Sequence, residues 1–283
     1  MTDASVGAGE ARPDGAGPQV GGGPPQVAPD QQRHLAEQVA AMDRRLSDVS
    51  VVLGRVEAAA GAARRTPAWN RVTEGERRIQ VALVVAVMIF LQVRLPERFT
   101  MIGWWVLPAI EVGLLVTLLI LDPGRISRTE RRLRLLSLGY VAVASLANGW
   151  AAVTLVLGLV RGTEGRSAES LLTVGGNIWL TNVLIFAIWY WDLDRGGPAA
   201  RAQALRTTPD FVFPQMTSPE LAKPDWTPQF GDYLYLAFTN ATAFSPTDVL
   251  PYSRWSKQAM ALQSAISLIV GALIIARAVN ILQ

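Results

Sequence analysis

The sequence predicts an all-α protein, a polytopic membrane helix bundle with a re-entrant helix and an N-terminal coiled coil. Three observations lead to this fold class. Of the 283 residues, 50% are hydrophobic and 17% are charged. From about residue 79 onward, several windows hold close to 20 apolar residues, the length that crosses roughly 30 Å of hydrocarbon. An unbroken heptad pattern precedes these windows, and an apolar segment too short to cross the bilayer precedes the last of them.

Several chemical classes are excluded by composition. The chain has no cysteine, which excludes disulfides, thiolate metal sites and thiol nucleophiles. Its single histidine, His34, excludes histidine-based zinc sites and catalytic triads. The start, MTDASVGAGE, lacks a basic run followed by an apolar core, so no cleaved signal peptide is expected. We therefore expect no enzyme, no cofactor, no bound metal and no nucleic-acid partner.

The first two segments differ in periodicity. Residues 1–30 are rich in Gly, Pro, Ala and Gln, and such a composition predicts a disordered tail. In residues 31–63, apolar side chains recur at alternating spacings of 4 and 3, at Leu35, Val39, Met42, Leu46, Val49, Leu53 and Val56. This 3.5-residue period predicts a coiled-coil oligomerisation helix, and leucine at position a with β-branched residues at d favours more than two strands. A helix lying on the membrane surface is the alternative.

A membrane region and a loop follow. Residues 79–191 are expected to form a four-helix membrane domain, with spans at about 79–95, 102–121, 135–160 and 171–191. Residues 192–230 are polar and rich in proline, which predicts a loop. The last domain, 231–283, combines the short re-entrant segment with a final membrane helix at about 258–281.

Positive charge alternates between the connections of these spans. Lys and Arg number five before the first span (64–78), then two (94–100), five (122–134), two (161–170) and three (192–206). Cytoplasmic loops retain Lys and Arg, so the alternation predicts a multi-pass cell-membrane protein with a cytoplasmic N-terminus. A fifth crossing then places the C-terminus outside.

The informative stretch begins near residue 231. About twelve moderately apolar residues, 232–243, are too few to cross the bilayer, and Pro246 and Pro251 end any helix that they form. Irregular backbone at membrane depth is tolerated only where it is buried in protein or lines a wet cavity. We therefore expect a short helix that turns back and borders a pore between subunits. A hairpin that only packs against the bundle is the alternative.

This stretch resembles the pore region of potassium channels. The segment from Asp232 to Thr239, DYLYLAFT, is followed by Thr242, Asp248 and Pro251 and by a helix ending IIARAVN. That family has an aromatic-rich pore helix, a T-x-G-Y-G-D filter, a D-x-x-P exit and an inner helix. The resemblance covers about residues 231–281 and implies a re-entrant pore-type helix. The implied pore residues are Thr242, Ala243, Phe244, Ser245, Pro246, Thr247 and Asp248.

The filter sequence and the side of the membrane both differ from that family. Residues 243–247 stand where potassium channels have T-V-G-Y-G, whose glycines allow stacked carbonyls to face a dehydrated ion. Potassium selectivity is therefore not carried over, and the oxygens of Thr242, Ser245, Thr247 and Asp248 predict weak selection of monovalent cations. Potassium channels also present this loop from outside, whereas the charge count places it on the cytoplasmic side.

Polar residues in the last helix are further candidates. Gln263, Ser264 and Ser267 form a stripe beside Gly271, and in the channel interpretation this stripe lines the pore. A contact between helices through small residues is the alternative.

A carboxyl group is expected inside the second span. Glu111 lies at its middle, where a carboxylate is costly unless it is neutral, paired or wet. Asn148 and Asn182, near the middle of the third and fourth spans, are the expected hydrogen-bond partners. A protonated Glu111 that only holds helices together is the alternative.

The sequence thus predicts an oligomeric ion channel in the lipid bilayer, a homotetramer with a degenerate potassium-channel-type pore loop that passes monovalent cations. A non-conducting membrane scaffold that recruits partners through its coiled coil is the alternative.

Overall fold

The computed structural model describes residues 29–63, 66–77, 79–121, 125–126, 131–164, 167–243 and 248–282. This described part is mostly helical. The helices are α1 (Pro29–Ala63), α2 (Ile79–Val93), α3 (Val106–Leu121), α4 (Arg131–Val160), α5 (Ala168–Leu193), α6 (Pro198–Ala202), α7 (Pro214–Thr217), α8 (Phe230–Ala243) and α9 (Arg254–Leu282). The strands are β1 (Glu76–Arg77), β2 (Arg125–Ile126), β3 (Phe211–Val212) and β4 (Leu250–Pro251). The predicted tail, 1–30, lies outside the described residues except for the two that begin α1.

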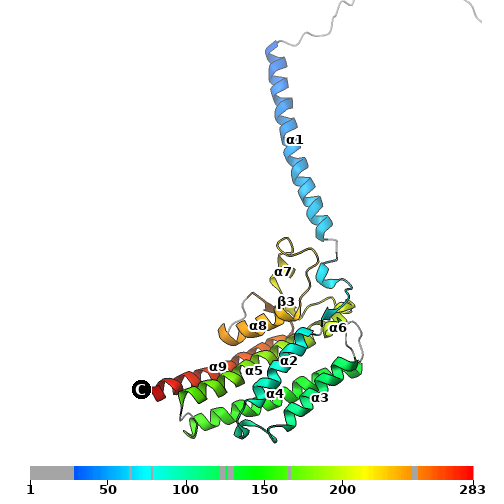
Figure 1. Cartoon of the computed structure of the whole chain (residues 1–283). Coiled ribbons are helices and arrows are strands. Elements are labelled where there is room, and N and C mark those ends of the chain that lie inside the picture. The colour runs from blue at the N-terminus through cyan, green and yellow to red at the C-terminus, as the bar shows by residue number, and fades with distance from the viewer. Residues whose placement is uncertain are drawn as a thin grey trace, which may run out of the picture. The chain divides into compact units, whose positions relative to one another are not determined.

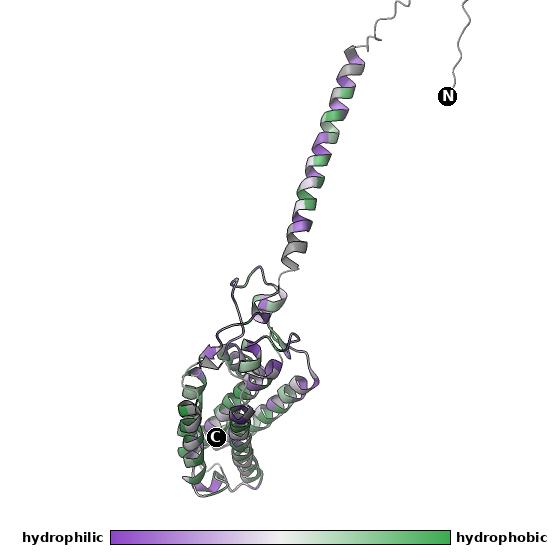
Figure 2. Ribbon diagram, turned by 90° about the vertical axis from the view of Figure 1, so that its right-hand side faces the viewer, coloured by the Kyte–Doolittle hydropathy of each residue, from purple (hydrophilic) through white to green (hydrophobic). Residues whose placement is uncertain are grey.

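The chain divides into two compact units between residues 65 and 66. The described part of the first is the single long helix α1, which covers the predicted coiled-coil segment. Every residue of the predicted seam is exposed, from Val49 at 53% to Val39 at 63%. Figure 2 shows apolar and polar residues alternating along this helix. A helix with one uncovered apolar seam is stable in water mainly when another helix covers it.

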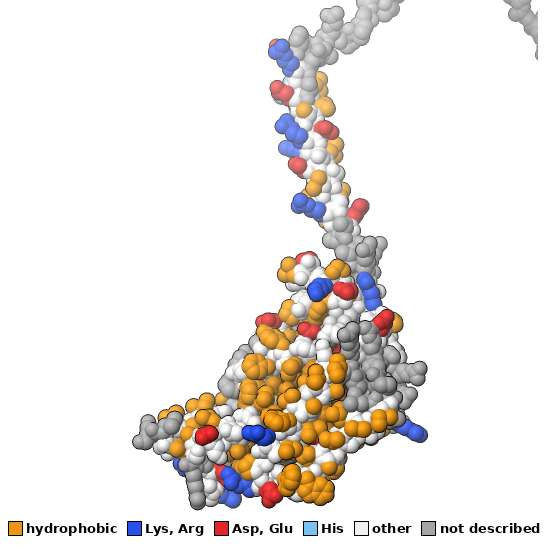
Figure 3. All heavy atoms as spheres, in the orientation of Figure 1, with side chains coloured by type: hydrophobic (Ala, Val, Ile, Leu, Met, Phe, Trp, Pro, Cys, Tyr) orange, Lys and Arg blue, Asp and Glu red, His pale blue; other side chains and the backbone are white. Residues whose placement is uncertain are grey.

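The second unit is a helix bundle (Figure 1). Three helices are long and apolar enough to cross a membrane, over Arg134–Val160, Ala168–Gly196 and Arg254–Ile281. The spans predicted at 79–95 and 102–121 form shorter apolar helices, α2 and α3. Figure 3 shows hydrophobic side chains over much of one flank of this unit, with few charges among them. An extended exposed apolar surface with few charges is typical of a surface that lipid covers.

Helix α5 lies at the centre of the bundle and packs against α2, α4, α8 and α9. Its residues from Thr181 to Ile188 are all buried. A helical segment that is buried on every side is apolar all round, and this segment is apolar apart from Thr181 and Asn182. Ser167 caps the start of the helix, and its side chain accepts a hydrogen bond from the Ser170 backbone N–H.

The connections between helices gather at two ends of the bundle. β1, before α2, pairs antiparallel with β2, which lies between α3 and α4. Glu76 also contacts Arg201, beyond α5, so three connections share one end, here called the charged end. At the other end, Arg98 pairs with Glu164 at 2.9 Å. The connections with more Lys and Arg lie at the charged end, and the two connections with fewer lie at the other end. The arrangement of the connections therefore follows the alternation of the Lys and Arg counts.

Residues 192–230 are more ordered than the predicted loop. They contain α6, α7 and β3, and β3 pairs antiparallel with β4 just before α9. Phe211 and Phe213 are buried, and their rings contact Tyr233 at 6.4 and 5.3 Å between centroids. The prolines and polar residues that suggested a loop here form a folded cap on the charged end.

Close packing of α5 on α9 generates the first prediction. A side chain added at Gly175 would meet Ile274, with its Cβ 2.1 Å from Cδ1 and 2.8 Å from Cγ1, whereas Gly176 has open space. We expect Gly175→Val to destabilise the bundle by about 1–3 kcal/mol through overpacking. Gly176→Val carries the same change in helix propensity and serves as the control. Thermal unfolding in detergent measures the difference, and equal midpoints for the two variants would contradict this packing.

Candidate functional site

Helix α8 is fastened to α9 by a buried amide. The Gln263 side chain is fully buried, and its Nε2 donates to the Ala237 carbonyl at 2.8 Å. Its Oε1 accepts from Asn240 Nδ2 at 2.8 Å and from the Tyr190 hydroxyl at 2.7 Å. Asn240 Nδ2 also donates to the Met260 carbonyl at 3.0 Å, and Ser264 donates to Asn240 Oδ1 at 3.0 Å. Because an unpaired amide in an apolar interior is costly, this set of bonds specifies one position of α8 on α9.

The two ends of α8 lie beside different levels of the bundle. Near its start, the Tyr233 hydroxyl donates to Asp194 Oδ2 at 2.6 Å, at the charged end. Near its finish, Phe238 packs edge-on against Trp179, with 6.1 Å between ring centroids. Trp179 precedes the end of α5 by 14 residues, or about 21 Å of helix. Helix α8 therefore runs from the charged end to the middle of α5, where it ends (Figure 1).

An ion pair holds the charged end together. Arg201 Nη2 lies 2.6 Å from Glu76 Oε1, and Arg201 Nη1 donates to the carbonyls of Trp191 (2.6 Å) and Asp194 (3.0 Å). Burial alone would lower the pKa of the Arg201 guanidinium, but the charges of Glu76, Tyr233 and Asp194 and the hydrogen bond to Glu76 together outweigh it and raise the pKa above its usual value. The guanidinium also lies 5.1 Å from the Tyr233 ring centroid. Arg201 thereby connects the segment before α2 with α5, α6 and α8.

A second cluster at the same end surrounds Asp194. Asp194 Oδ1 accepts from the Asp210 backbone N–H at 2.9 Å, and Asp210 in turn accepts from the Arg195 N–H and the Trp255 indole, each at 2.8 Å. Arg195 has φ 51°, a left-handed conformation that costs a side-chain-bearing residue free energy. Its Nη1 donates to the Trp69 carbonyl at 2.6 Å. This strained turn directs the chain from α5 into the cap.

One face of α8 has few contacts within this chain. Gly231, Tyr235, Phe238 and Thr242 recur at helical spacing and are exposed. Thr242, on the last turn, donates its hydroxyl to the Phe238 carbonyl at 3.0 Å. A surface that is aromatic with one hydroxyl at its inner end suits contact with lipid or with another protein chain.

The predicted pore residues are only partly within the described structure. Residues 244–247, which include Phe244, Ser245, Pro246 and Thr247, lie outside it, and Ala243 is described only as the end of α8. Thr242 and Asp248, on either side of that gap, are exposed. The geometry of the constriction itself therefore stays a prediction.

The stripe on α9 faces the interior of the protein. Gln263 is 0% and Ser267 1% exposed, and Ser267 accepts from Asn182 Nδ2 at 3.2 Å. Side chains that are buried against α5 and α8 do not line a pore, so the prediction is wrong for these two residues, and their contacts fit the alternative of a helix contact. Ser264 and Gly271 are half-buried, and a side chain at Gly271 would meet open space.

Glu111 has a different partner from the two that were predicted. It is fully buried, and its Oε1 accepts from Gln92 Nε2 at 2.9 Å. Within the described residues, Glu111 Oε2 and Gln92 Oε1 have no hydrogen-bond partner. Asn182 contacts Ser267 instead, and Asn148 has no hydrogen bond with Glu111. Gln92 lies in the last turn of α2.

The sequence predicts a polar loop over residues 192–230 and does not predict the charged cluster within it. Four charged residues of this segment are buried, namely Asp192, Asp194, Arg195 and Arg201. The available signal is the run D-L-D-R-G-G-P, in which charges directly follow a span and two glycines allow a tight turn. Gly196 and Gly197 have φ of 84° and 96°, so this turn does require glycine.

No family model, no curated protein and no solved structure matches the chain. Among the described residues, no three His, Cys, Asp or Glu side chains gather where a metal ion could bind. The site that the geometry offers is therefore α8 with its anchors, the Gln263 amide at mid-bundle and the Arg201 cluster at the charged end.

The Arg201 ion pair generates a prediction on stability. Arg201→Gln leaves Glu76 buried without its cation, so we expect a loss of about 3–5 kcal/mol in the free energy of unfolding. Arg254→Gln, at an exposed position at the start of α9, removes the same charge and serves as the control. Adding Glu76→Gln to Arg201→Gln is expected to recover part of the loss. Denaturant unfolding measures these free energies. Similar free energies of unfolding for Arg201→Gln and Arg254→Gln would contradict a stabilising role of the ion pair.

Proposed function

We propose that copies of this chain, most simply four, assemble around a shared path that conducts monovalent cations across the cell membrane. The proposal rests on α8. This helix starts at the same end of the bundle as α9, runs to the middle of α5 and stops there. The chain is back at the starting end by β4, which pairs with β3. A half-length helix, a short return and then a long apolar helix are the parts of a pore loop.

The path would be formed by the inner end of α8 and the returning segment of each copy. Thr242 is exposed at that inner end, and Asp248 is exposed on the return. Hydroxyl, carbonyl and carboxylate oxygens attract cations, and the departures from the potassium-channel filter argue for weak selectivity. Because Gln263 and Ser267 are occupied inside the protomer, they serve to hold helices together, Gln263 between α9 and α8 and Ser267 between α9 and α5.

Assembly of several copies follows from uncovered surfaces. The α1 seam is exposed along its whole length, and its heptad period fits a parallel coiled coil with the same seam of other copies. The aromatic face of α8 would meet a neighbouring copy in the membrane. With valine and leucine at position a and β-branched residues among the d positions, more than two strands are favoured.

The membrane topology in this proposal has five crossings. Helices α2 and α3 have 15 and 16 residues, or about 22–24 Å, and cross with local thinning of the bilayer and snorkelling of Arg94 and Arg98. The richer Lys and Arg content of the connections at the charged end puts that end, and the N-terminus, in the cytoplasm.

Ion flux in proteoliposomes tests the path. We expect Thr242→Val to change the conductance or the relative permeability of Na⁺ and K⁺ several-fold, because it removes a hydroxyl oxygen next to the constriction. Thr117→Val is matched, since Thr117 is also exposed and donates to a carbonyl four residues earlier. Absence of conductance in the unmodified protein, over a range of voltage and pH, would contradict the proposal.

The oligomer is tested separately. Leu46→Asp places a charge in the α1 seam, and Ser47→Asp places the same charge on the neighbouring position outside it. We expect the first variant to lose higher oligomers in native mass spectrometry and the second to keep them. Equal oligomer distributions would contradict assembly through α1. Intact oligomers without any conductance would instead favour the scaffold alternative.

A further inference from the structure

The buried contact between α2 and α3 leaves two hydrogen-bonding atoms without partners. Gln92 Nε2 donates to Glu111 Oε1 at 2.9 Å, and Glu111 is 0% exposed. The other polar atom of each group, Gln92 Oε1 and Glu111 Oε2, is buried and has no partner within the described residues. Buried polar atoms are normally paired, so these two atoms require an explanation.

An ionised Glu111 does not provide one. A carboxylate oxygen and an amide oxygen both only accept hydrogen bonds, so Glu111 Oε2 and Gln92 Oε1 could not pair with each other. Among the described residues, no Lys, Arg or His forms an ion pair with Glu111. A buried carboxylate without a cation is costly, above all at membrane depth.

A protonated Glu111 accounts for both atoms. The hydroxyl of the acid supplies a donor for Gln92 Oε1, while Glu111 Oε1 continues to accept from Gln92 Nε2. A carboxylic acid and a primary amide are complementary in this way, because each carries one donor and one acceptor on the same carbon atom. Gln92 Oε1 is closed to solvent, so its partner has to come from the protein.

The surroundings of Glu111 offer no other solution. Helices α2 and α4 pack against α3. Helix α2 has no charged residue, and the arginines of α4 all lie within its first four residues. Tyr140 on α4 is near enough for the charge of a Glu111 carboxylate to act on it, but its buried hydroxyl has no hydrogen-bond partner in the described part of the chain. The pair with Gln92 is therefore the arrangement that the neighbouring helices allow.

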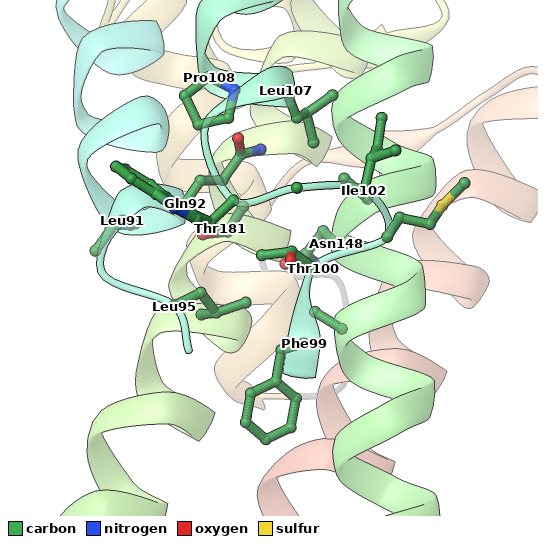
Figure 4. Close-up of a pocket in the computed structure, with 15 residues that line it drawn as sticks. Leu91, Gln92, Leu95, Phe99, Thr100, Ile102, Leu107, Pro108, Asn148 and Thr181 are labelled. Carbon is green, nitrogen blue, oxygen red and sulfur yellow. The ribbon is translucent and has the colours of Figure 1, made fainter. Parts of the chain in front are cut away.

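Water can approach this pair from one side. A cavity of about 30 Å³, room for about two water molecules, is lined by Gln92 and bordered by exposed Trp104 (Figure 4). Indoles concentrate at the membrane–water interface, so the cavity opens near that level. Glu111 itself does not line the cavity. The carboxyl group therefore exchanges its proton with this water only when α2 and α3 separate slightly.

We propose that Glu111 is a proton-binding site that is occupied at neutral pH and holds α3 to α2 through two hydrogen bonds with Gln92. Loss of the proton removes the donor to Gln92 Oε1 and leaves a buried negative charge. The contact between α2 and α3 therefore loosens as the pH rises. The proposal does not depend on ion conduction, because neither helix contributes to the path beside α8.

Infrared spectroscopy of the full chain in vesicles detects this proton, because a protonated carboxyl group has a C=O stretching band that a carboxylate lacks. We expect the band at neutral pH in the unmodified protein, and we expect Glu111→Gln to remove one carboxyl group's share of it. Glu97→Gln removes an exposed carboxyl group and leaves the band unchanged. Identical bands in the unmodified protein and in Glu111→Gln would overturn the proposal.

Gln92→Leu provides a second spectroscopic test, which also serves if Glu111→Gln does not fold. It removes the amide but keeps the carboxyl group. We expect the carboxyl band to shift to higher frequency, because its C=O no longer accepts a hydrogen bond. A band at the same frequency would show that Gln92 does not pair with the acid.

Thermal unfolding in detergent measures the linkage between the proton and stability. The folded protein holds this proton more tightly than the solvated carboxyl group of the unfolded chain does, so stability falls as the pH rises. Glu111→Gln keeps one donor and one acceptor toward Gln92 but cannot ionise. Relative to this variant, we expect the midpoint of the unmodified protein to fall by about 5 °C or more between about pH 5 and pH 9. The same pH dependence in both proteins would contradict the proposal.

The separation of the helices is measured with spin labels. Val87 on α2 and Val116 on α3 are exposed, and a cysteine in place of each carries the label. We expect the distribution of distances between the labels to broaden as the pH rises over the same range, and to stay unchanged when Glu111→Gln is added. A distribution that does not respond to pH in either protein would rule out loosening of this contact.

Discussion

An amide buried among apolar helices has to find its hydrogen bonds within the protein, and both polar atoms of Gln263 do so with partners from two other helices. Its nitrogen donates to the backbone of α8, and its oxygen accepts from α8 and α5. In water such bonds contribute little, but in an apolar interior each one left unmade is costly. The position and depth of α8 follow from this constraint, and the exposed position of Thr242 follows from the position of α8.

The charged residues obey the same principle at the other end of α8. Two guanidiniums and several carboxylates are buried there, at and beyond the end of α5, and each finds a partner. Arg201 and Tyr233 join the segment before α2 to the start of α8. The start of α8 is therefore fixed by charge and its inner end by the Gln263 amide, so that the helix has little freedom to slide along α5.

Sequence reasoning succeeded where the periodicity or the length of an apolar segment determines the structure. The long apolar windows became the three long helices of the bundle, and the segment at 232–243 became α8, extended by two residues. Sequence reasoning failed where the structure depends on which neighbour a helix face contacts. The spacing of Gln263 and Ser267 marks one face of a helix, but spacing does not tell whether that face meets a pore or α8. Glu111 required a partner, yet Gln92 is 19 residues away on another helix, beyond the reach of any local pattern.

The proposed pore requires that α8 enters the bilayer and that the chain returns on the same side. Because the chain has no cysteine, single introduced cysteines at the exposed positions 231, 235, 238, 242, 248 and 252 can each carry a spin label in vesicles. Collision rates with oxygen and with a water-soluble nickel complex then report the depth of each label. We predict that depth increases from 231 to 242 and decreases again by 252. A profile that stays at the surface throughout, or one that continues to the opposite face, would contradict the account.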